Sequence, residues 1–207
     1  AESSGAEIAV GLAYYIFCVS AFLLLGIVLL YPVTKSFTSL SMRQFAKGIW
    51  PAQVLAFSNR SSIACLPIML AVARQRLKLP ENVVGFVLPF AVSTFKLNMG
   101  VSAIFQMLFL LHVYGIQVEP AVLLLAMAAL AAQSVATPGL PSGVIWTTTP
   151  VYLALGIPME GIVLTNVVDT IPDLFKTTLN VSGNLSITAL VSGRQSTTES
   201  EQGVRVE

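Results

Sequence analysis

The sequence predicts an all-α membrane protein that combines transmembrane helices with two opposed re-entrant helical hairpins. Composition supports the first part of this prediction: of 207 residues, 55% are hydrophobic and only 10% are charged, and the mean hydropathy is +0.81. Soluble domains carry about 25% charged residues. The second part comes from the charge distribution, because uncharged runs long enough to cross a bilayer alternate with short basic connectors.

The predicted elements follow one another along a membrane domain at residues 8–192. In chain order they are an N-terminal loop, a transmembrane helix, a re-entrant hairpin, an interrupted helix, a second hairpin, a polar-striped helix and a tail: residues 1–7, 8–31, 50–73, 83–111, 120–159, 161–191 and 193–207. The transmembrane helix is an uncharged run of sufficient length for one span. The tail is rich in Ser, Thr and Glu, a composition typical of disorder, and is expected in the cytoplasm.

The hairpins are predicted from the positions of the basic residues. Outside the apolar runs, these residues lie at 32–49, at 74–81 and in the tail. Cytoplasmic loops carry an excess of Lys and Arg, so we assign all three stretches to the cytoplasm. Segment 50–73 then begins and ends inside, and segment 120–159 begins and ends outside. Two full spans of about 17 residues remain the alternative for the second segment.

Polar residues interrupt the span that follows each hairpin. Lys96 lies near the middle of residues 83–111, and carboxylates lie within residues 161–191. Two opposed hairpins, each followed by an interrupted span, are typical of an inverted-repeat transporter core. Irregular backbone at membrane depth must contact protein or water, so we expect the hairpin tips to line a cavity.

The last span carries most of the candidate chemistry. Its polar residues are separated by 4, 3, 4 and 4 positions and share one helix face: Asp169, Asp173, Lys176, Asn180 and Asn184. Ionisable groups at bilayer depth are costly and commonly mark a substrate or ion path. The alternatives are a helix cap with its charges among the headgroups, and an internal ion pair between Asp173 and Lys176.

The hairpin tips supply complementary groups. Unpaired N–H groups at a half-helix tip suit an anion, and the tip residues expected to cradle a carboxylate are Ser61, Ser62, Thr137 and Gly139. Arg60 and Lys176 can each pair with a carboxylate, Arg60 through a bidentate fork. Asp173 can hold an ammonium group, and Asn180 can bind a substrate or an ion. A structural role for Arg60 is the alternative.

Together these motifs resemble the C-terminal half of the dicarboxylate/amino acid:cation symporter family, the glutamate transporter homologues. Phe57–Pro67 is similar to the family's serine-rich first tip, Ser134–Pro141 to the second, and Asp169–Asn184 to the last helix. The resemblance covers about residues 8–191. It implies that the chain is not an enzyme. It implies instead the moving core of a secondary transporter, which carries a dicarboxylate or acidic amino acid with Na⁺ or H⁺ by an elevator motion.

The resemblance also assigns substrate contacts. Asp173 matches the residue that binds the substrate amino group, and Lys176 stands where an arginine binds a side-chain carboxylate. Thr177 and Asn180 match further substrate contacts. No cofactor other than the coupling cation and no nucleic acid are implied.

Family members are multi-pass proteins of the cell (inner or plasma) membrane and work as trimers. Their N-terminal scaffold helices form the trimer contacts, and these helices are not in this sequence. The expected partners are therefore a small dicarboxylate or amino acid, the lipid membrane, and a homotrimer once the scaffold is present. We expect the chain to be a fragment or to need a separate N-terminal chain.

The coupling site departs from the family pattern. The sodium motif Asn-Met-Asp-Gly-Thr aligns with Phe95–Met99, and a slip of three would restore only Asn98-Met99. The last helix ends its motif on Asn184 instead of a carboxylate. We expect the cation-coupling site to contain Lys96, Asn98, Asp169, Asn180 and Asn184. These residues do not by themselves define a metal site. We hypothesise that the Lys96 ammonium fills the space of a missing sodium; pairing with Asp169 or Asp173, or snorkelling, is the alternative.

Two other function classes remain open. An intramembrane aspartyl protease would use Asp169 and Asp173, but these lie one turn apart on one helix, whereas a catalytic dyad needs two facing carboxylates. A non-transporting fragment or sodium-independent derivative of the family is the main alternative.

Overall fold

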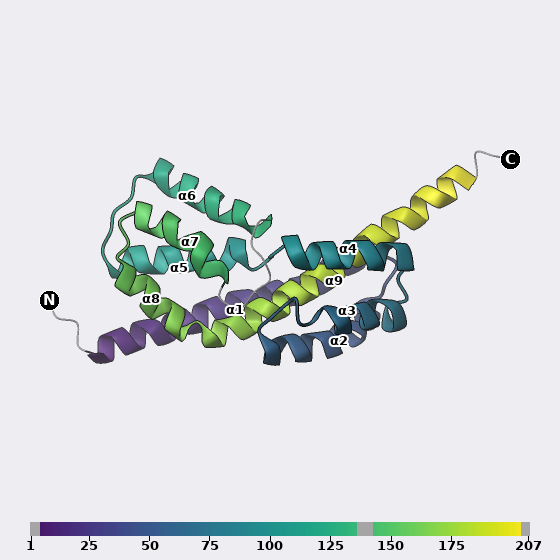
Figure 1. The fold of residues 1–207 in the computed structure, drawn as a ribbon, viewed down its shortest axis with the longest axis horizontal. Helices are drawn as coiled ribbons and strands as arrows, with labels where there is room; N and C mark the ends of the chain where they lie inside the picture. The colour runs from purple at the N-terminus through teal and green to yellow at the C-terminus, as the bar shows by residue number, and fades with distance from the viewer. Residues whose placement is uncertain (1–4, 136–142, 204–207) are drawn as a thin grey trace.

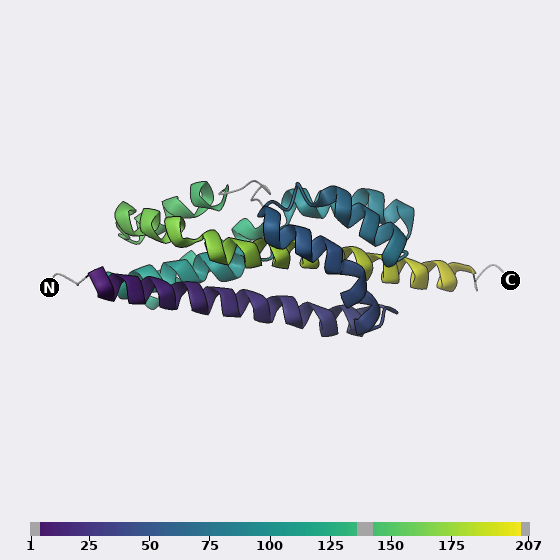
Figure 2. The same ribbon diagram turned by 90° about the horizontal axis from the view of Figure 1, so that it is seen from below.

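The computed structural model describes residues 5–135 and 143–203, and every regular element within these ranges is helical. The prediction of an all-α protein is therefore confirmed for the described residues. Two long helices, α1 (Gly5–Phe37) and α9 (Thr170–Gly203), pack against each other and form the axis of the molecule (Figure 1). Figure 2 shows α1 along one face of the molecule, where α9, α2 and α5 all contact it.

The remaining helices form two groups along this axis (Figure 1). The first group contains three α-helices and a π-helical turn: α2 (Met42–Asn59), α3 (Leu66–Ala71), η1 (Val72–Arg76) and α4 (Glu81–Thr94). The second contains four α-helices and a 3₁₀ turn: α5 (Met99–Val113), α6 (Pro120–Ala132), η2 (Gln133–Val135), α7 (Gly143–Ala154) and α8 (Met159–Val168). Each group has its own apolar core, and a third core joins α1 to α9 and α5.

The segment predicted as the first hairpin is a helix–turn–helix. Its first helix begins earlier than predicted, at Met42, because Ser41 and Gln44 form a capping box in which each side chain accepts the other's backbone N–H. The chain turns at Arg60, whose φ of 56° is left-handed. The returning helix packs closely on α2 because Gly48 leaves space for the Leu77 side chain.

The predicted interrupted helix is divided in two. α4 ends at Thr94, Phe95 is extended (φ −116°, ψ 124°), and α5 begins at Met99, so the break contains Lys96 as predicted. The predicted polar-striped helix is also divided, at Asp169 between α8 and α9. α9 continues to Gly203, and the structure therefore extends the helix into the stretch for which the sequence predicts disorder.

Two helical stretches of the described residues, Ala9–Phe37 and Glu81–Val113, are long and apolar enough to cross a membrane. Both carry large apolar side chains on the surface; Phe17 and Phe86 are each 71% exposed. Exposed apolar surface of this extent suits contact with lipid.

Candidate functional site

The break between α4 and α5 meets α9 and η2 at the middle of the molecule. The backbone N–H of Asn98 donates to the Asn180 side-chain oxygen at 3.0 Å. The backbone N–H of Lys96 donates to the Ser134 carbonyl oxygen at 2.7 Å. Because α4 and α5 do not satisfy these N–H groups, partners on other elements hold the break open.

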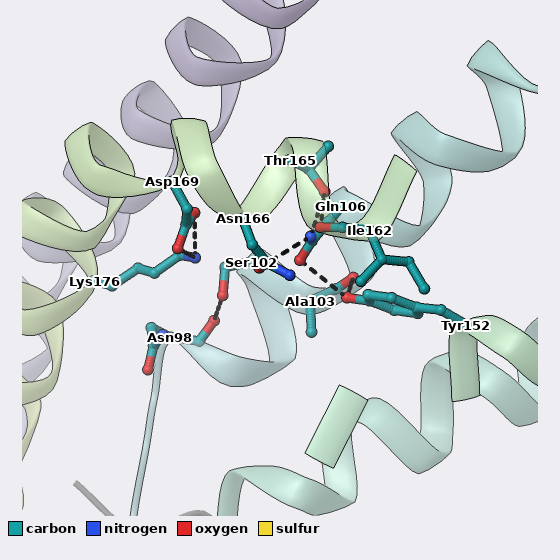
Figure 3. Close-up of polar contacts among 10 residues, drawn as sticks. All are labelled: Asn98, Ser102, Ala103, Gln106, Tyr152, Ile162, Thr165, Asn166, Asp169 and Lys176. Atoms are coloured by element: carbon teal, nitrogen blue, oxygen red, sulfur yellow. Dashed lines mark hydrogen bonds and ion pairs between the residues drawn. The ribbon is translucent and has the colours of Figure 1, made fainter. Parts of the chain in front are cut away.

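A buried ion pair lies at the start of α9 (Figure 3). The Lys176 Nζ donates to both oxygens of Asp169 at 2.6 and 2.7 Å. The internal pair with Asp173, one alternative from the sequence, is not formed. Residues seven apart share a helix face, and helical side chains point toward the N-terminus, so Lys176 reaches back to Asp169.

Asp173 is half-buried one turn along the same face. The charges of Lys176, Asp169 and Arg60 all act on its carboxyl group. Arg60 is exposed at the tip between α2 and α3. Arg60 therefore interacts electrostatically with Asp173, the residue predicted to bind the ammonium group of the substrate.

The two serines of the first tip differ in their surroundings. Ser62 is buried, whereas Ser61 is half-buried and its hydroxyl oxygen accepts the backbone N–H of Ala64 at 3.3 Å. Ser61 thus helps to close the turn. Thr137 and Gly139, the residues predicted at the second tip, lie outside the described residues.

The polar stripe faces the protein interior. Its buried members are Lys176, Asn180 and Asn184, and its partly exposed members are Asp169 and Asp173; the neighbouring Thr177 is also buried. Asn184 is fully buried, and neither its oxygen nor its nitrogen has a hydrogen-bond partner among the described residues. The buried side-chain oxygen of Asn98 also lacks one.

Lys96 is buried in the break, at 4% exposed. Its Nζ donates to the Val92 carbonyl oxygen at 3.1 Å. Within the described part of the chain it forms no ion pair, so the pairing with Asp169 or Asp173 considered from the sequence is not present.

A second polar cluster lies beside the ion pair, between α5, α7 and α8 (Figure 3). The Gln106 amide donates to the Thr165 hydroxyl at 2.7 Å, and the Tyr152 hydroxyl donates to the Ala103 carbonyl oxygen at 2.8 Å. Tyr152 also donates to the Gln106 oxygen at 3.4 Å. Sequence reasoning missed this cluster, and its one signal was a glutamine within an apolar run.

The arrangement places groups of both charges near the start of α9. It offers cations at Arg60 and Lys176, carboxylates at Asp169 and Asp173, and a neutral amide at Asn180. No group of three His, Cys, Asp or Glu that could hold a metal ion occurs within residues 5–135 and 143–203.

Comparison with known proteins gives a consistent picture. The family model of the sodium:dicarboxylate symporter family matches residues 1–194. The neutral amino acid transporter B(0) of Mus musculus is 26% identical over 174 residues, which cover 83% of this chain and 31% of that protein. The proton/glutamate-aspartate symporter of Bacillus subtilis (strain 168) is 27% identical over 173 residues, 82% of this chain and 41% of that protein.

Excitatory amino acid transporter 3 of Mus musculus is 27% identical over 151 residues, 72% of this chain and 28% of that protein. The chain therefore spans about a third of the length of these relatives. The match to the family model covers both segments predicted as hairpins, the break at Lys96 and the polar stripe. The chain belongs to the sodium:dicarboxylate symporter family.

Proposed function

We propose that this chain is the substrate-binding core of a secondary transporter that moves a dicarboxylate or acidic amino acid together with a cation. The observation that supports this proposal best is the contact of Asn98 with Asn180, at 3.0 Å. It joins the irregular backbone of a broken helix to a polar stripe, and transporters commonly bind substrates and ions at such places.

Each charged group then has a role. Asp173 binds the substrate ammonium, and Lys176 and Arg60 bind carboxylates. Thr177 and Asn180 add hydrogen bonds. Since Lys176 is paired with Asp169 in the structure, a substrate carboxylate must share the ammonium with Asp169 or displace it.

The proposed motion is that of an elevator. The two helical hairpins would enter the membrane from opposite faces, with the second as a gate, and the core would move against scaffold helices in a trimer at the cell membrane. The apolar surfaces of α1 and α4–α5 support a membrane location. The helix–turn–helix form of α2 and α3 is compatible with re-entry.

The coupling ion is proposed to be a proton, or transport to be independent of sodium. The Lys96 ammonium is buried at the break, and Asn184 stands where the family pattern ends on a carboxylate. An ammonium group supplies the positive charge that a bound sodium otherwise provides. Sodium-dependent uptake that persists unchanged in Lys96→Met would contradict this role.

Thermal unfolding of the purified protein, completed with its scaffold helices, tests the binding function. Aspartate, glutamate and succinate are added separately in sodium and in choline buffer. We expect stabilisation by at least one ligand in both buffers, and its loss in Asp173→Asn for the amino acids but not for succinate, which has no ammonium group. Stabilisation in sodium alone would reject the role of Lys96. No stabilisation by any ligand would favour a non-transporting derivative.

A further inference from the structure

A groove between α1, α2 and α9 lies apart from the polar stripe's charged residues. It has a volume of about 370 Å³, which is within the range of about 300–1,000 Å³ that is common for ligand pockets. Its walls include the side chains of Leu24, Val28, Trp50, Val54 and Phe57, which are 43–64% exposed. The groove is therefore open and mainly apolar.

Three polar side chains that line this groove, those of Tyr31, Gln53 and Thr178, already have partners. The Gln53 amide nitrogen lies 3.0 Å from the Tyr31 hydroxyl and donates to the Ser182 hydroxyl at 2.9 Å. The Thr178 hydroxyl donates to the Leu174 carbonyl oxygen at 2.8 Å. Because these groups are satisfied and the other walls are mainly apolar, a hydrocarbon chain suits the groove better than a polar solute.

Two of the three helical walls of the groove, those from α1 and α2, continue to a lysine at one end. On α1 the lining residues include Leu24, Val28 and Tyr31, and the next position of this stripe is Lys35. On α2 the stripe runs back from Phe57 through Val54 and Trp50 to Lys47, at helical spacings of 3, 4 and 3. Both lysines are exposed, and they lie at the ends of the helices that face the connector between α1 and α2.

The second lysine has a further cation beside it. The Arg76 guanidinium donates to the Lys47 carbonyl oxygen at 3.4 Å, which places η1 against this part of α2. Gly48 allows the approach because a side chain there would meet Leu77. Two basic residues from separate elements, Lys47 and Arg76, therefore lie close together beyond the apolar stripe of α2.

We propose that this groove binds an anionic phospholipid, with an acyl chain along Trp50, Val54 and Val28 and the phosphate held by Lys35 and Lys47. The charges oppose those of an acidic headgroup, and Trp50 lies between lysine and apolar wall, where Trp is enriched at membrane interfaces. Anionic lipids concentrate in the cytoplasmic leaflet, the side predicted for residues 32–49. The inference rests on the membrane location of the chain and not on its substrate.

Native mass spectrometry of the full chain tests the proposal, with dioleoylphosphatidylglycerol and dioleoylphosphatidylcholine as probes. We expect preferential retention of the phosphatidylglycerol, weakened about fivefold by Lys35→Gln or Lys47→Gln, since a basic residue near an anionic surface contributes about 1 kcal/mol. Lys78→Gln is the matched control, because Lys78 is exposed on the η1–α4 connector and lies on neither stripe. It should leave retention unchanged.

Val54→Trp fills the groove while keeping both lysines and should release the lipid. Equal retention of the two phospholipids, or an equal effect of Lys78→Gln and Lys47→Gln, would overturn the proposal by showing that no headgroup site exists. Unchanged retention in Val54→Trp would overturn it by excluding the acyl chain from the groove, and would leave a protein helix as the occupant. Circular dichroism of each variant checks that the helices are intact. Ligand stabilisation of the transport site by aspartate is measured in parallel on the protein completed with its scaffold helices. It is expected to be unaffected, which separates this inference from the proposed function.

Discussion

The two interrupted helices break in different ways. Between α4 and α5 the break is wide, and its N–H groups at Lys96 and Asn98 donate to Ser134 and Asn180 on other elements. Between α8 and α9 the break is confined to Asp169, and the adjacent hydrogen bonds remain within the same chain segment. The wide break therefore depends on hydrogen bonds to other elements, whereas the narrow break supports itself through local hydrogen bonds. Its carboxylate, Asp169, pairs with Lys176.

The largest effect is expected at the narrow break, from Lys176→Met. Removing the ammonium leaves the Asp169 carboxylate, which is 21% exposed, without its partner. Breaking such a pair costs about 3 kcal/mol of the free energy of unfolding. Lys176→Arg retains a cation and is the control. Thermal unfolding in detergent measures both, and equal stability of Lys176→Met and the parent protein would show that the Asp169 carboxylate does not need this partner.

A smaller effect is expected at the wide break, from Asn180→Leu. The substitution leaves the buried N–H of Asn98 without an acceptor, at a cost of about 2 kcal/mol. Asn184→Leu is the matched control, because the Asn184 amide has no partner in the described structure and its replacement should be nearly neutral. Hydrogen exchange of the Asn98 backbone N–H should accelerate in Asn180→Leu but not in Asn184→Leu. Equal destabilisation by both would mean that α9 does not hold the break.

The smallest effect is expected away from both breaks, from Tyr152→Phe. The variant loses the bond from the hydroxyl group to the Ala103 carbonyl oxygen, which contributes about 1 kcal/mol. This hydrogen bond anchors α7 to α5, so we expect its loss to lower thermal stability modestly without any change in ligand-induced stabilisation. A loss of ligand-induced stabilisation in Tyr152→Phe would show that the second polar cluster belongs to the binding site.

Helical periodicity was sufficient to predict the stripe on α9 and its orientation. Residues at spacings of three and four share a face, and burial of Lys176, Asn180 and Asn184 confirms that this face is internal. A lysine within an apolar run also placed the break in the interrupted helix, because an ionisable group at membrane depth commonly marks a polar interruption of a span. The first prediction rests on the spacing of residues along a helix, and the second on the cost of placing a charge at membrane depth.

The spacing of residues along the sequence could not identify which side chains form ion pairs or hydrogen bonds with each other. Asp169 and Asp173 both share a face with Lys176 and both lie N-terminal to it, so neither spacing nor side-chain direction predicts that Lys176 pairs with Asp169. The contact of Gln106 with Thr165 joins residues that are 59 positions apart, and no local rule predicts it. Gln53 and Ser182 were likewise missed, because their bond joins different helices. Re-entry of the hairpins and an elevator motion stay predictions.

Arg60 shows how the demands of folding and of binding can conflict at a single residue. A left-handed backbone costs a residue with a side chain about 1 kcal/mol, and glycine avoids this cost. A chain selected for stability alone would place glycine at this turn. An arginine in the same position sacrifices some stability to keep a guanidinium at the apex of the hairpin. Stabilising this protein by glycine substitution at its turns would therefore remove a charge that the binding site is proposed to need.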